Sequence, residues 1–71
     1  MFVVYSKADC GYCVRAKDHL DLLNEDYVTK DITDPSVMTE LMERMPSART
    51  VPQIWKDEEY IGGYTELAKK F

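Results

Sequence analysis

The sequence predicts an α/β fold in which a four-stranded mixed sheet is flanked by helices, with the elements in the order βαβ, then α, then ββα. Two observations carry this prediction. A β-branched and aromatic run at residues 2–5, a helical pattern and a second strand-like run fall within about thirty residues, which is typical of a βαβ unit with a parallel, right-handed crossover. A further helical pattern and a hairpin pattern follow. Because 71 residues bury only one small core, we expect residues 1–71 to form a single domain.

The first strand and the first helix are predicted from their apolar residues. Residues 2–5 form a continuous apolar run, which suits a strand that is buried on both faces. Residues 11–24 are expected to be helical, because Ala16, Leu20 and Leu23 follow the second cysteine at helical spacing and form an inner stripe.

The second strand is expected at Tyr27 to Ile32, and a second helix follows it. Asp34 suits the N-cap position and Pro35 the first helical position. Pro46 ends this helix, because the residue before a proline is driven away from helical angles. The apolar stripe of the helix consists of Val37, Leu41 and Met45, joined by Met38 and Met42. At this spacing we expect the methionines to pack in the core rather than to form a plastic binding surface.

A hairpin and a short helix complete the chain. Residues 51–55 are expected to begin a third strand, a turn at Asp57-Glu58 to reverse the chain, and residues 59–61 to form a fourth strand. The pair Gly62-Gly63 breaks this strand. Thr65 is expected to cap a last helix, which carries Leu67, Ala68 and Phe71.

The two cysteines of the chain form the motif Cys10-Gly11-Tyr12-Cys13, at the junction between the first strand and the first helix. The first sulfur therefore lies beside the unpaired N–H groups of a helix N-terminus, which lowers the pKa of the thiol and makes a thiolate available. The second sulfur, one helical turn on, can close a disulfide with the first. The motif predicts a reversible redox couple of the thioredoxin-like type.

Two other interpretations of the cysteine pair remain open. A structural disulfide would close a very short loop, which gives little entropic stabilisation. A zinc site would lack partners, because the only histidine, His19, lies six residues after Cys13 and on a different face of the helix. Carboxylates or a second chain would have to complete such a site.

Charge and composition exclude some functions. The formal net charge of −4 and the isoelectric point of about 4.8 argue against nucleic-acid binding, which requires a basic face. Positive charge is nevertheless concentrated around the cysteines, at Lys7, Arg15 and Lys17, where it favours a thiolate and an anionic substrate. No apolar run approaches a membrane span, so no membrane partner is expected.

Cysteine usage indicates the compartment. The apolar run at residues 2–5 is too short for the hydrophobic region of a signal peptide and lacks a basic leader. A chain with two cysteines and no export signal is expected in a reducing compartment, the cytoplasm, where a disulfide is transient and catalytic.

The sequence resembles the glutaredoxin family of the thioredoxin fold over essentially its whole length. The matching segments are Tyr5-Ser6-Lys7 leading to Cys10-Gly11-Tyr12-Cys13, then Thr50-Val51-Pro52, then Gly62-Gly63 before the last helix. Each segment alone is weak evidence, but together and in this order they are specific. The resemblance implies a glutathione-dependent thiol–disulfide oxidoreductase that reduces protein disulfides or glutathione mixed disulfides.

The resemblance also implies roles for individual residues near the cysteines. Cys10 would be the exposed nucleophile and Cys13 the shielded resolving thiol. Lys7 would help to bind a carboxylate of glutathione, and its charge would stabilise the Cys10 thiolate. Tyr12 would supply an aromatic wall.

The rest of the implied glutathione site lies late in the chain, at Thr50, Val51, Pro52, Gly63, Tyr64 and Thr65. The proline matching Pro52 is cis in this family, which turns the Val51 backbone toward an extended cysteinyl peptide that binds like an added strand. Gly63 would allow close backbone approach, and the N-terminus of the last helix would hold the second carboxylate of glutathione. Thr65 offers a hydroxyl to the γ-glutamyl group.

The sequence departs from the family pattern at three places, and one of them is the short final helix, which trims the core. The family often has proline where this chain has Gly11, and some members with a small residue there hold a [2Fe–2S] cluster between two subunits through the first cysteine, here Cys10, and glutathione. Without a cluster a monomer is expected. The family often has acidic residues directly after the two glycines, where this chain has Tyr64 and Thr65. A further alternative is an electron donor, for example to ribonucleotide reductase, that depends on thioredoxin reductase.

Overall fold

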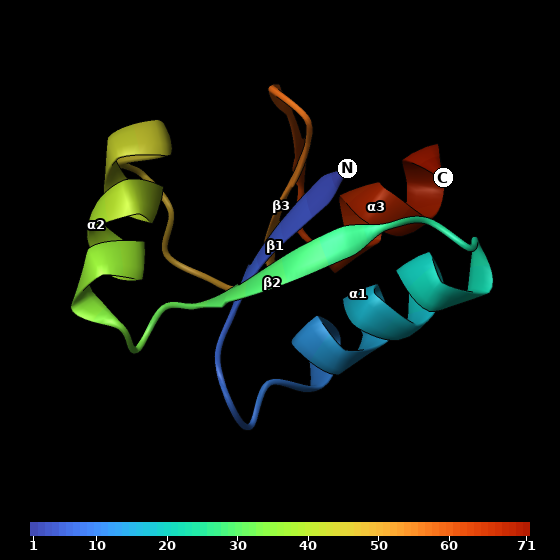
Figure 1. Cartoon of the computed structure of the whole chain (residues 1–71), viewed down its shortest axis with the longest axis horizontal. Helices are drawn as coiled ribbons and strands as arrows, with labels where there is room; N and C mark the ends of the chain where they lie inside the picture. Colours follow the sequence, from blue (N-terminus) through green and yellow to red (C-terminus); the bar gives the residue numbers. More distant parts are fainter.

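A four-stranded mixed sheet in the order β2-β1-β3-β4 forms the centre of the computed structural model, which describes residues 1–71 (Figure 1). β1 (Phe2–Ser6) pairs with β2 (Tyr27–Asp31) in parallel and with β3 (Gln53–Lys56) antiparallel. β4 (Glu59–Gly62) pairs antiparallel with β3 and completes the hairpin. The predicted α/β fold of the thioredoxin-like class is confirmed, including its order of elements.

Three helices cover the two faces of the sheet. α1 (Gly11–Leu22) and α3 (Tyr64–Lys70) lie on one face, and α2 (Pro35–Arg44) lies on the other (Figure 1). None of the three has the length and apolar composition needed to span a bilayer.

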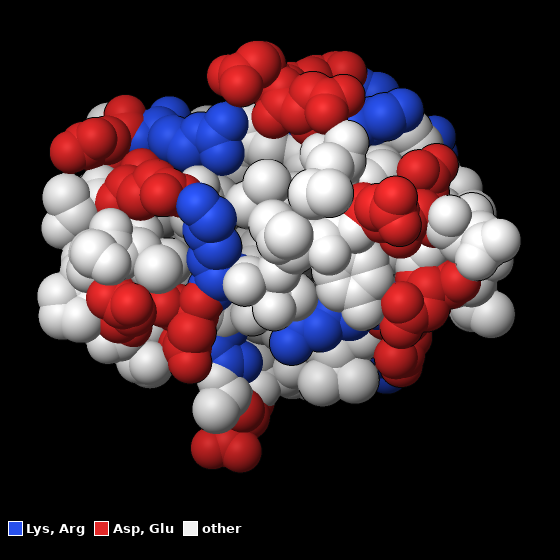
Figure 2. Space-filling model, in the orientation of Figure 1, with Lys and Arg blue, Asp and Glu red and all other residues white.

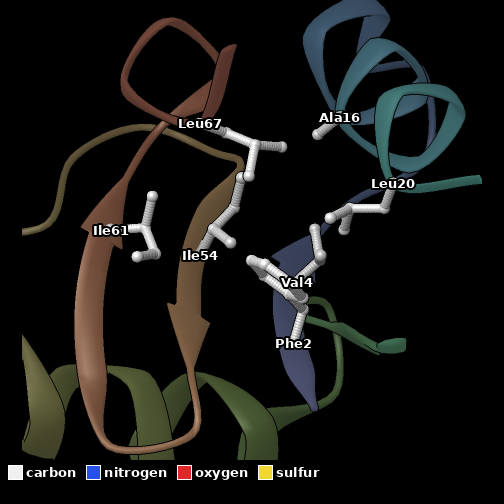
Figure 3. Packing of buried hydrophobic residues seen from close by; sticks show 7 residues of the cluster. All are labelled: Phe2, Val4, Ala16, Leu20, Ile54, Ile61 and Leu67. Atoms are coloured by element: carbon white, nitrogen blue, oxygen red, sulfur yellow. The ribbon is translucent and has the colours of Figure 1, made fainter. Parts of the chain in front are cut away.

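The larger core lies between the sheet and the helices α1 and α3. It contains seven buried residues, Phe2, Val4, Ala16, Leu20, Ile54, Ile61 and Leu67, whose side chains converge in Figure 3. A smaller core on the α2 face contains Tyr5, Leu41 and Trp55. Alternate residues of β1 and β3 thus point into different cores, which explains why the run at residues 2–5 is apolar throughout.

The structure ends α1 at Leu22, two residues before the predicted end. Leu23 is the C-cap, its N–H donates to the His19 carbonyl oxygen at 3.1 Å, and Asn24 adopts a left-handed backbone with φ of 61°. The chain turns away from the helix there, so that Leu23 is 38% exposed. The prediction that Leu23 belongs to the inner stripe was therefore wrong.

The second and third helices also differ in detail from the prediction. Leu41 is buried, and Val37, Met42 and Met45 pack against it, but Met38 is 37% exposed and does not belong to the stripe. Thr65 does not cap α3. The helix begins at Tyr64 with Gly63 as its N-cap, because the Gly63 carbonyl already accepts the first helical bond, from Leu67 N–H at 3.0 Å.

The strand boundaries shift by one or two residues. β2 ends at Asp31, although Ile32 N–H still donates to the Ser6 carbonyl oxygen at 2.9 Å. β3 begins at Gln53 rather than at residue 51, since Pro52 has no N–H to join the ladder. Residues 50–52 are thereby left as an irregular segment in front of the sheet.

Charged side chains of both signs are interspersed on the face viewed in Figure 2, with acidic groups more numerous and an uncharged area between them. This face carries no continuous basic patch of the kind that binds nucleic acid.

Candidate functional site

The two cysteines lie at the N-terminus of α1 and are joined by a disulfide. Cys10 is the N-cap residue, with an extended backbone, and its Sγ accepts a hydrogen bond from Cys13 N–H at 3.2 Å. The first turn of α1 carries no acidic residue, so no carboxylate within that turn opposes a negative charge on this sulfur. Cys13 is 1% exposed, whereas Cys10 is only partly buried. The accessible sulfur is therefore that of Cys10.

A pocket of about 290 Å³ opens beside the cysteines. Its eight lining residues are Tyr12, Thr50, Val51, Pro52, Gly63, Tyr64, Thr65 and Glu66. They come from α1, from the segment before β3 and from the start of α3. Cys10 adjoins this pocket, because its Sγ lies 3.6 Å from the Val51 carbonyl oxygen. Residues that are forty positions apart in the sequence thus meet around one sulfur atom.

Two tyrosines form a wall of the pocket. The ring centroids of Tyr12 and Tyr64 lie 6.0 Å apart, and the Arg15 guanidinium lies 5.4 Å from the centre of the Tyr12 ring. The His19 ring packs edge-on against Tyr64, with centroids 6.4 Å apart. Tyr12 remains 57% exposed, so its ring is available to cover a bound molecule.

The opposite wall is the turn at residues 50–52. The Val51–Pro52 peptide bond is cis, as the resemblance implied. The Thr50 carbonyl oxygen accepts a hydrogen bond from Gln53 Nε2 at 2.8 Å. An ideal Cβ at Gly63 would lie 3.5 Å from the Pro52 carbonyl oxygen, so this glycine sits against the turn.

Sequence reasoning missed Glu66, which supplies the only charged side chain among the pocket residues. Its Oε1 accepts from Gly63 N–H at 2.7 Å, so it occupies one of the free donors at the start of α3. A glutamate three residues after an N-cap is the signature of this arrangement, and the sequence contained that signal. Burial raises the pKa of the nearby Tyr60 hydroxyl, and the negative charge of Glu66 raises it further.

The structure does not bring Lys7 to the pocket lining. Lys7 is exposed on the loop between β1 and α1, which passes through a left-handed backbone at Asp9 with φ of 59°. No group of three or more His, Cys, Asp or Glu side chains is arranged to hold a metal ion.

Comparison with known proteins identifies the family. The family model for glutaredoxin matches residues 2–61. Glutaredoxin 1 of Escherichia coli strain K12 is 36% identical over 73 residues, which cover 93% of this chain and 86% of that protein. Glutaredoxin of Vibrio cholerae is 38% identical over 75 residues, which cover 94% of this chain and 86% of that protein.

Solved structures agree with the sequence comparison. The buckwheat glutaredoxin–glutathione complex superimposes with a TM-score of 0.82 at 32% identity and covers 97% of this chain and 66% of that one. Reduced Escherichia coli glutaredoxin gives a TM-score of 0.80 at 34% identity, covering 97% of this chain and 89% of that one. With its Cys-x-x-Cys pair at the start of α1, this chain belongs to the glutaredoxin family.

Proposed function

We propose that this chain is a glutathione-dependent thiol–disulfide oxidoreductase that reduces glutathione mixed disulfides and protein disulfides. Membership of the glutaredoxin family supports thiol–disulfide oxidoreductase activity in general. The observation that carries the finer proposal is the position of Cys10, whose sulfur is accessible at a helix N-terminus and lies 3.6 Å from the backbone of the Val51 turn. The known complex of the buckwheat relative with glutathione supports glutathione as the thiol that this chain uses.

The reaction divides into two exchanges of sulfur partners. In the reduced protein, the Cys10 thiolate attacks a sulfur of the substrate disulfide, a new S–S bond forms, and the released thiolate takes up a proton. The Cys13 thiolate then attacks the Cys10 sulfur and displaces the remaining partner, or a glutathione thiolate attacks the sulfur of a glutathione bound to Cys10 and displaces the Cys10 thiolate. Reduction of a protein disulfide thus consumes two free glutathione molecules, whereas a glutathione mixed disulfide consumes one and contributes its own, so each reaction releases one glutathione disulfide.

The pocket offers complementary groups for glutathione. The Val51 backbone can pair with the cysteinyl residue as an added strand would. The rings of Tyr12 and Tyr64 would cover its apolar surface, and Thr50, Pro52, Gly63 and Thr65 complete the contact surface. Lys7 would reach a carboxylate from the exposed loop. Glu66 faces the same region and suits the α-amino group of a γ-glutamyl residue.

The partner proteins would be disulfide-bonded or glutathionylated proteins of a reducing cytoplasm, and ribonucleotide reductase is one candidate. If thioredoxin reductase rather than glutathione were the main electron source, the oxidised chain would be reduced by that enzyme without glutathione. Supplying each reductant separately distinguishes the two.

Serine substitutions of the two cysteines test the mechanism. We expect Cys10→Ser to abolish turnover of the cysteine–glutathione mixed disulfide, because the other thiol, that of Cys13, is buried and cannot reach the substrate. Cys13→Ser should retain this turnover, since glutathione replaces the resolving thiol, and should lose reduction of protein disulfides. The assay couples glutathione disulfide formation to its reductase. Equal losses in both variants on the small substrate would contradict the assignment.

A second candidate function, a glutathione-ligated [2Fe–2S] dimer, is favoured by one observation at Gly11. An ideal Cβ at Gly11 would meet no heavy atom within 4 Å, so the space above the motif is open. Only Cys10 of each chain would serve as a protein ligand, with glutathione as the other. Anaerobic reconstitution with iron, sulfide and glutathione should then give visible absorbance and a dimer, and Gly11→Pro should lose both while keeping oxidoreductase activity. A colourless parent chain would remove this candidate alone.

A further inference from the structure

A buried side-chain amide links the pocket turn to the opposite face of the sheet. Gln53, the first residue of β3, is only 6% exposed. Its Nε2 donates to the Thr50 carbonyl oxygen at 2.8 Å, and its Oε1 accepts from the Tyr60 hydroxyl at 2.6 Å. Both ends of this amide are thus hydrogen-bonded, one to the turn and the other to β4.

Tyr60 is held in turn by aromatic contacts on the face that α2 covers. It lies opposite Trp55 in the ladder between β3 and β4, with ring centroids 4.8 Å apart. The Arg44 guanidinium of α2 lies 4.6 Å from the centre of the Trp55 ring. A continuous set of contacts therefore runs from α2, through two rings and one amide, to the Thr50 carbonyl.

The segment between α2 and β3, residues 45–52, packs Met45 and Ala48 against the smaller core but has few hydrogen bonds to the sheet. It forms no helix or strand, and the Arg49 side chain bonds only to the Pro46 and Ala48 carbonyls within the segment itself. Among the side-chain hydrogen bonds of the structure, only that of Gln53 joins this segment to a strand. This amide therefore provides the side-chain hydrogen bond that fixes the Thr50 carbonyl relative to the sheet.

We propose that Gln53 and Tyr60 are positioning residues for disulfide exchange, which hold the turn at residues 50–52 where the Val51 backbone can pair with a cysteinyl substrate beside Cys10. This role rests on the proposed function. Neither side chain touches the reacting sulfur atoms. Their loss should therefore weaken capture of the substrate and leave the intrinsic reactivity of the Cys10 thiol unchanged.

The test compares Gln53→Met, Gln53→Glu and Tyr60→Phe with the parent chain. One lost hydrogen bond corresponds to a fall of about three- to tenfold in kcat/KM for the cysteine–glutathione mixed disulfide, which we expect for Gln53→Met. Gln53→Glu keeps the acceptor for Tyr60 but loses the donor to Thr50, so its loss should be at least as large. Tyr60→Phe keeps the ring contact with Trp55 and should show a smaller loss.

Two readouts separate positioning from a merely structural role. The rate at which iodoacetamide alkylates reduced Cys10 should stay within about twofold of the parent rate, because this reagent does not use the turn. The matched control is Tyr27→Phe, which removes a tyrosine hydroxyl near Asp21 at the other end of the sheet. This control should leave kcat/KM unchanged.

Each outcome decides the proposal. An unchanged kcat/KM in Gln53→Met would overturn it. If the Gln53 variants do not fold, an unchanged kcat/KM in Tyr60→Phe would overturn it instead. A loss of the alkylation rate in parallel with kcat/KM would also overturn it. The same variants are assayed on insulin disulfides with dithiothreitol as reductant. If the parent chain reduces insulin but not the mixed disulfide, the glutathione proposal fails, and the insulin rates then decide the role of Gln53. A parent chain that is inactive on both substrates removes both proposals.

Discussion

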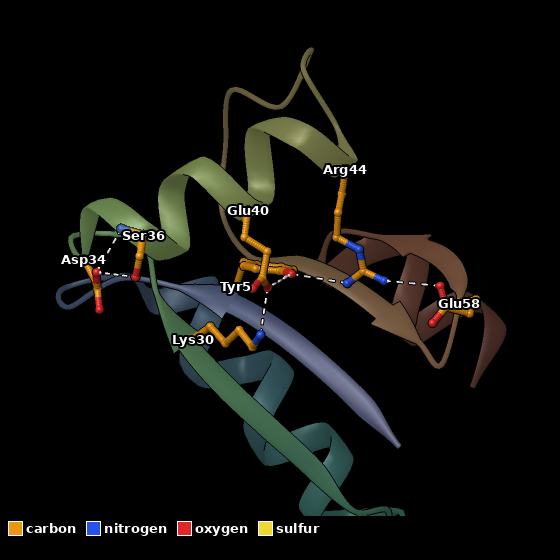
Figure 4. Close-up of polar contacts among 7 residues, drawn as sticks. All are labelled: Tyr5, Lys30, Asp34, Ser36, Glu40, Arg44 and Glu58. Atoms are coloured by element: carbon orange, nitrogen blue, oxygen red, sulfur yellow. Dashed lines mark hydrogen bonds and ion pairs between the residues drawn. The ribbon is translucent and has the colours of Figure 1, made fainter.

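The two faces of the sheet are held by different kinds of interaction. Between the sheet and the helices α1 and α3, seven buried apolar residues form one contiguous core. On the α2 face the buried apolar cluster has only three members, and a polar network joins one of them, Tyr5, to α2 (Figure 4). The redox motif begins the helix that is anchored by apolar burial, so the anchoring of this helix does not depend on groups that titrate.

The network on the α2 face centres on the hydroxyl of Tyr5, a residue whose ring is fully buried. This hydroxyl bonds to Glu40 and accepts from Arg44 Nη1 at 3.2 Å, and Glu40 also accepts from Lys30 Nζ at 2.7 Å. An outer ion pair joins Arg44 to the almost fully exposed Glu58 at 3.9 Å and adds little (Figure 4). Docking of α2 thus depends on groups that titrate.

The largest expected effect comes from truncating the apolar core, with a matched truncation on the other face. Leu20→Ala should lower the free energy of unfolding by about 3 to 5 kcal/mol, because the buried residues around Leu20 cannot close the cavity that the truncation leaves. Leu41→Ala should cost about 2 to 3 kcal/mol, because the partly buried side chains around Leu41 can close the gap. Urea denaturation measures both values. Equal costs would mean that the two faces do not differ in packing.

An intermediate effect is expected from Tyr5→Phe, which removes only the hydroxyl at the centre of the network. Glu40 keeps Lys30 as partner and Arg44 keeps its contact with Trp55, so the free energy of unfolding should fall by about 1 kcal/mol. A double-mutant cycle with Glu40→Gln measures the coupling. Strict additivity would show that the Tyr5–Glu40 bond contributes nothing to the docking of α2.

The smallest effect concerns acid. Hydrogen bonds from Lys30 and then from Tyr5 lower the pKa of Glu40 below its ordinary value of 4.5. A carboxyl whose pKa is lower in the folded state stabilises the fold above the unfolded-state pKa, and this contribution disappears as the pH falls through the folded-state pKa. Because Glu40 is 40% exposed, only a few tenths of a kcal/mol are expected.

Unfolding of Glu40→Gln and of the parent chain between pH 6 and about pH 3 measures this contribution. The stability difference between them should shrink below about pH 4.5. Other carboxyls with lowered pKa values, such as Asp34 beside Ser36, are present in both proteins and cancel. A pH-independent difference would exclude Glu40 as a titrating anchor.

The fold was predictable because its signals are local. The βαβ unit, the Asp34-Pro35 helix start and the hairpin turn each follow from a few neighbouring residues, and the structure confirms them. The boundaries were less predictable. Gly63 rather than Thr65 caps α3. The Gly63 N–H donates to the Glu66 carboxylate, and this bond depends on side-chain geometry that the sequence does not show.

The site was predictable only in part, because its residues meet through the fold. Motif resemblance selected the residues that line the pocket, apart from Glu66, but it also selected Lys7, which lies outside the lining. Tyr5 was predicted as an ordinary apolar strand residue. Its hydrogen-bond partner Glu40 lies 35 residues away in the sequence, and no local sequence pattern predicts such a pairing.

The order of the strands leaves β2 as an outer edge of the sheet. Unpaired edge strands invite edge-to-edge aggregation, and short strands with charged side chains resist it. β2 has five residues and ends in Lys30-Asp31. Pairing of two such edges would require desolvation of the ion pair between Lys30 and Glu40. In acid, where Glu40 is neutral, Lys30 remains positive and two such edges repel each other. The same side chain that helps to anchor α2 therefore protects the protein in concentrated solution.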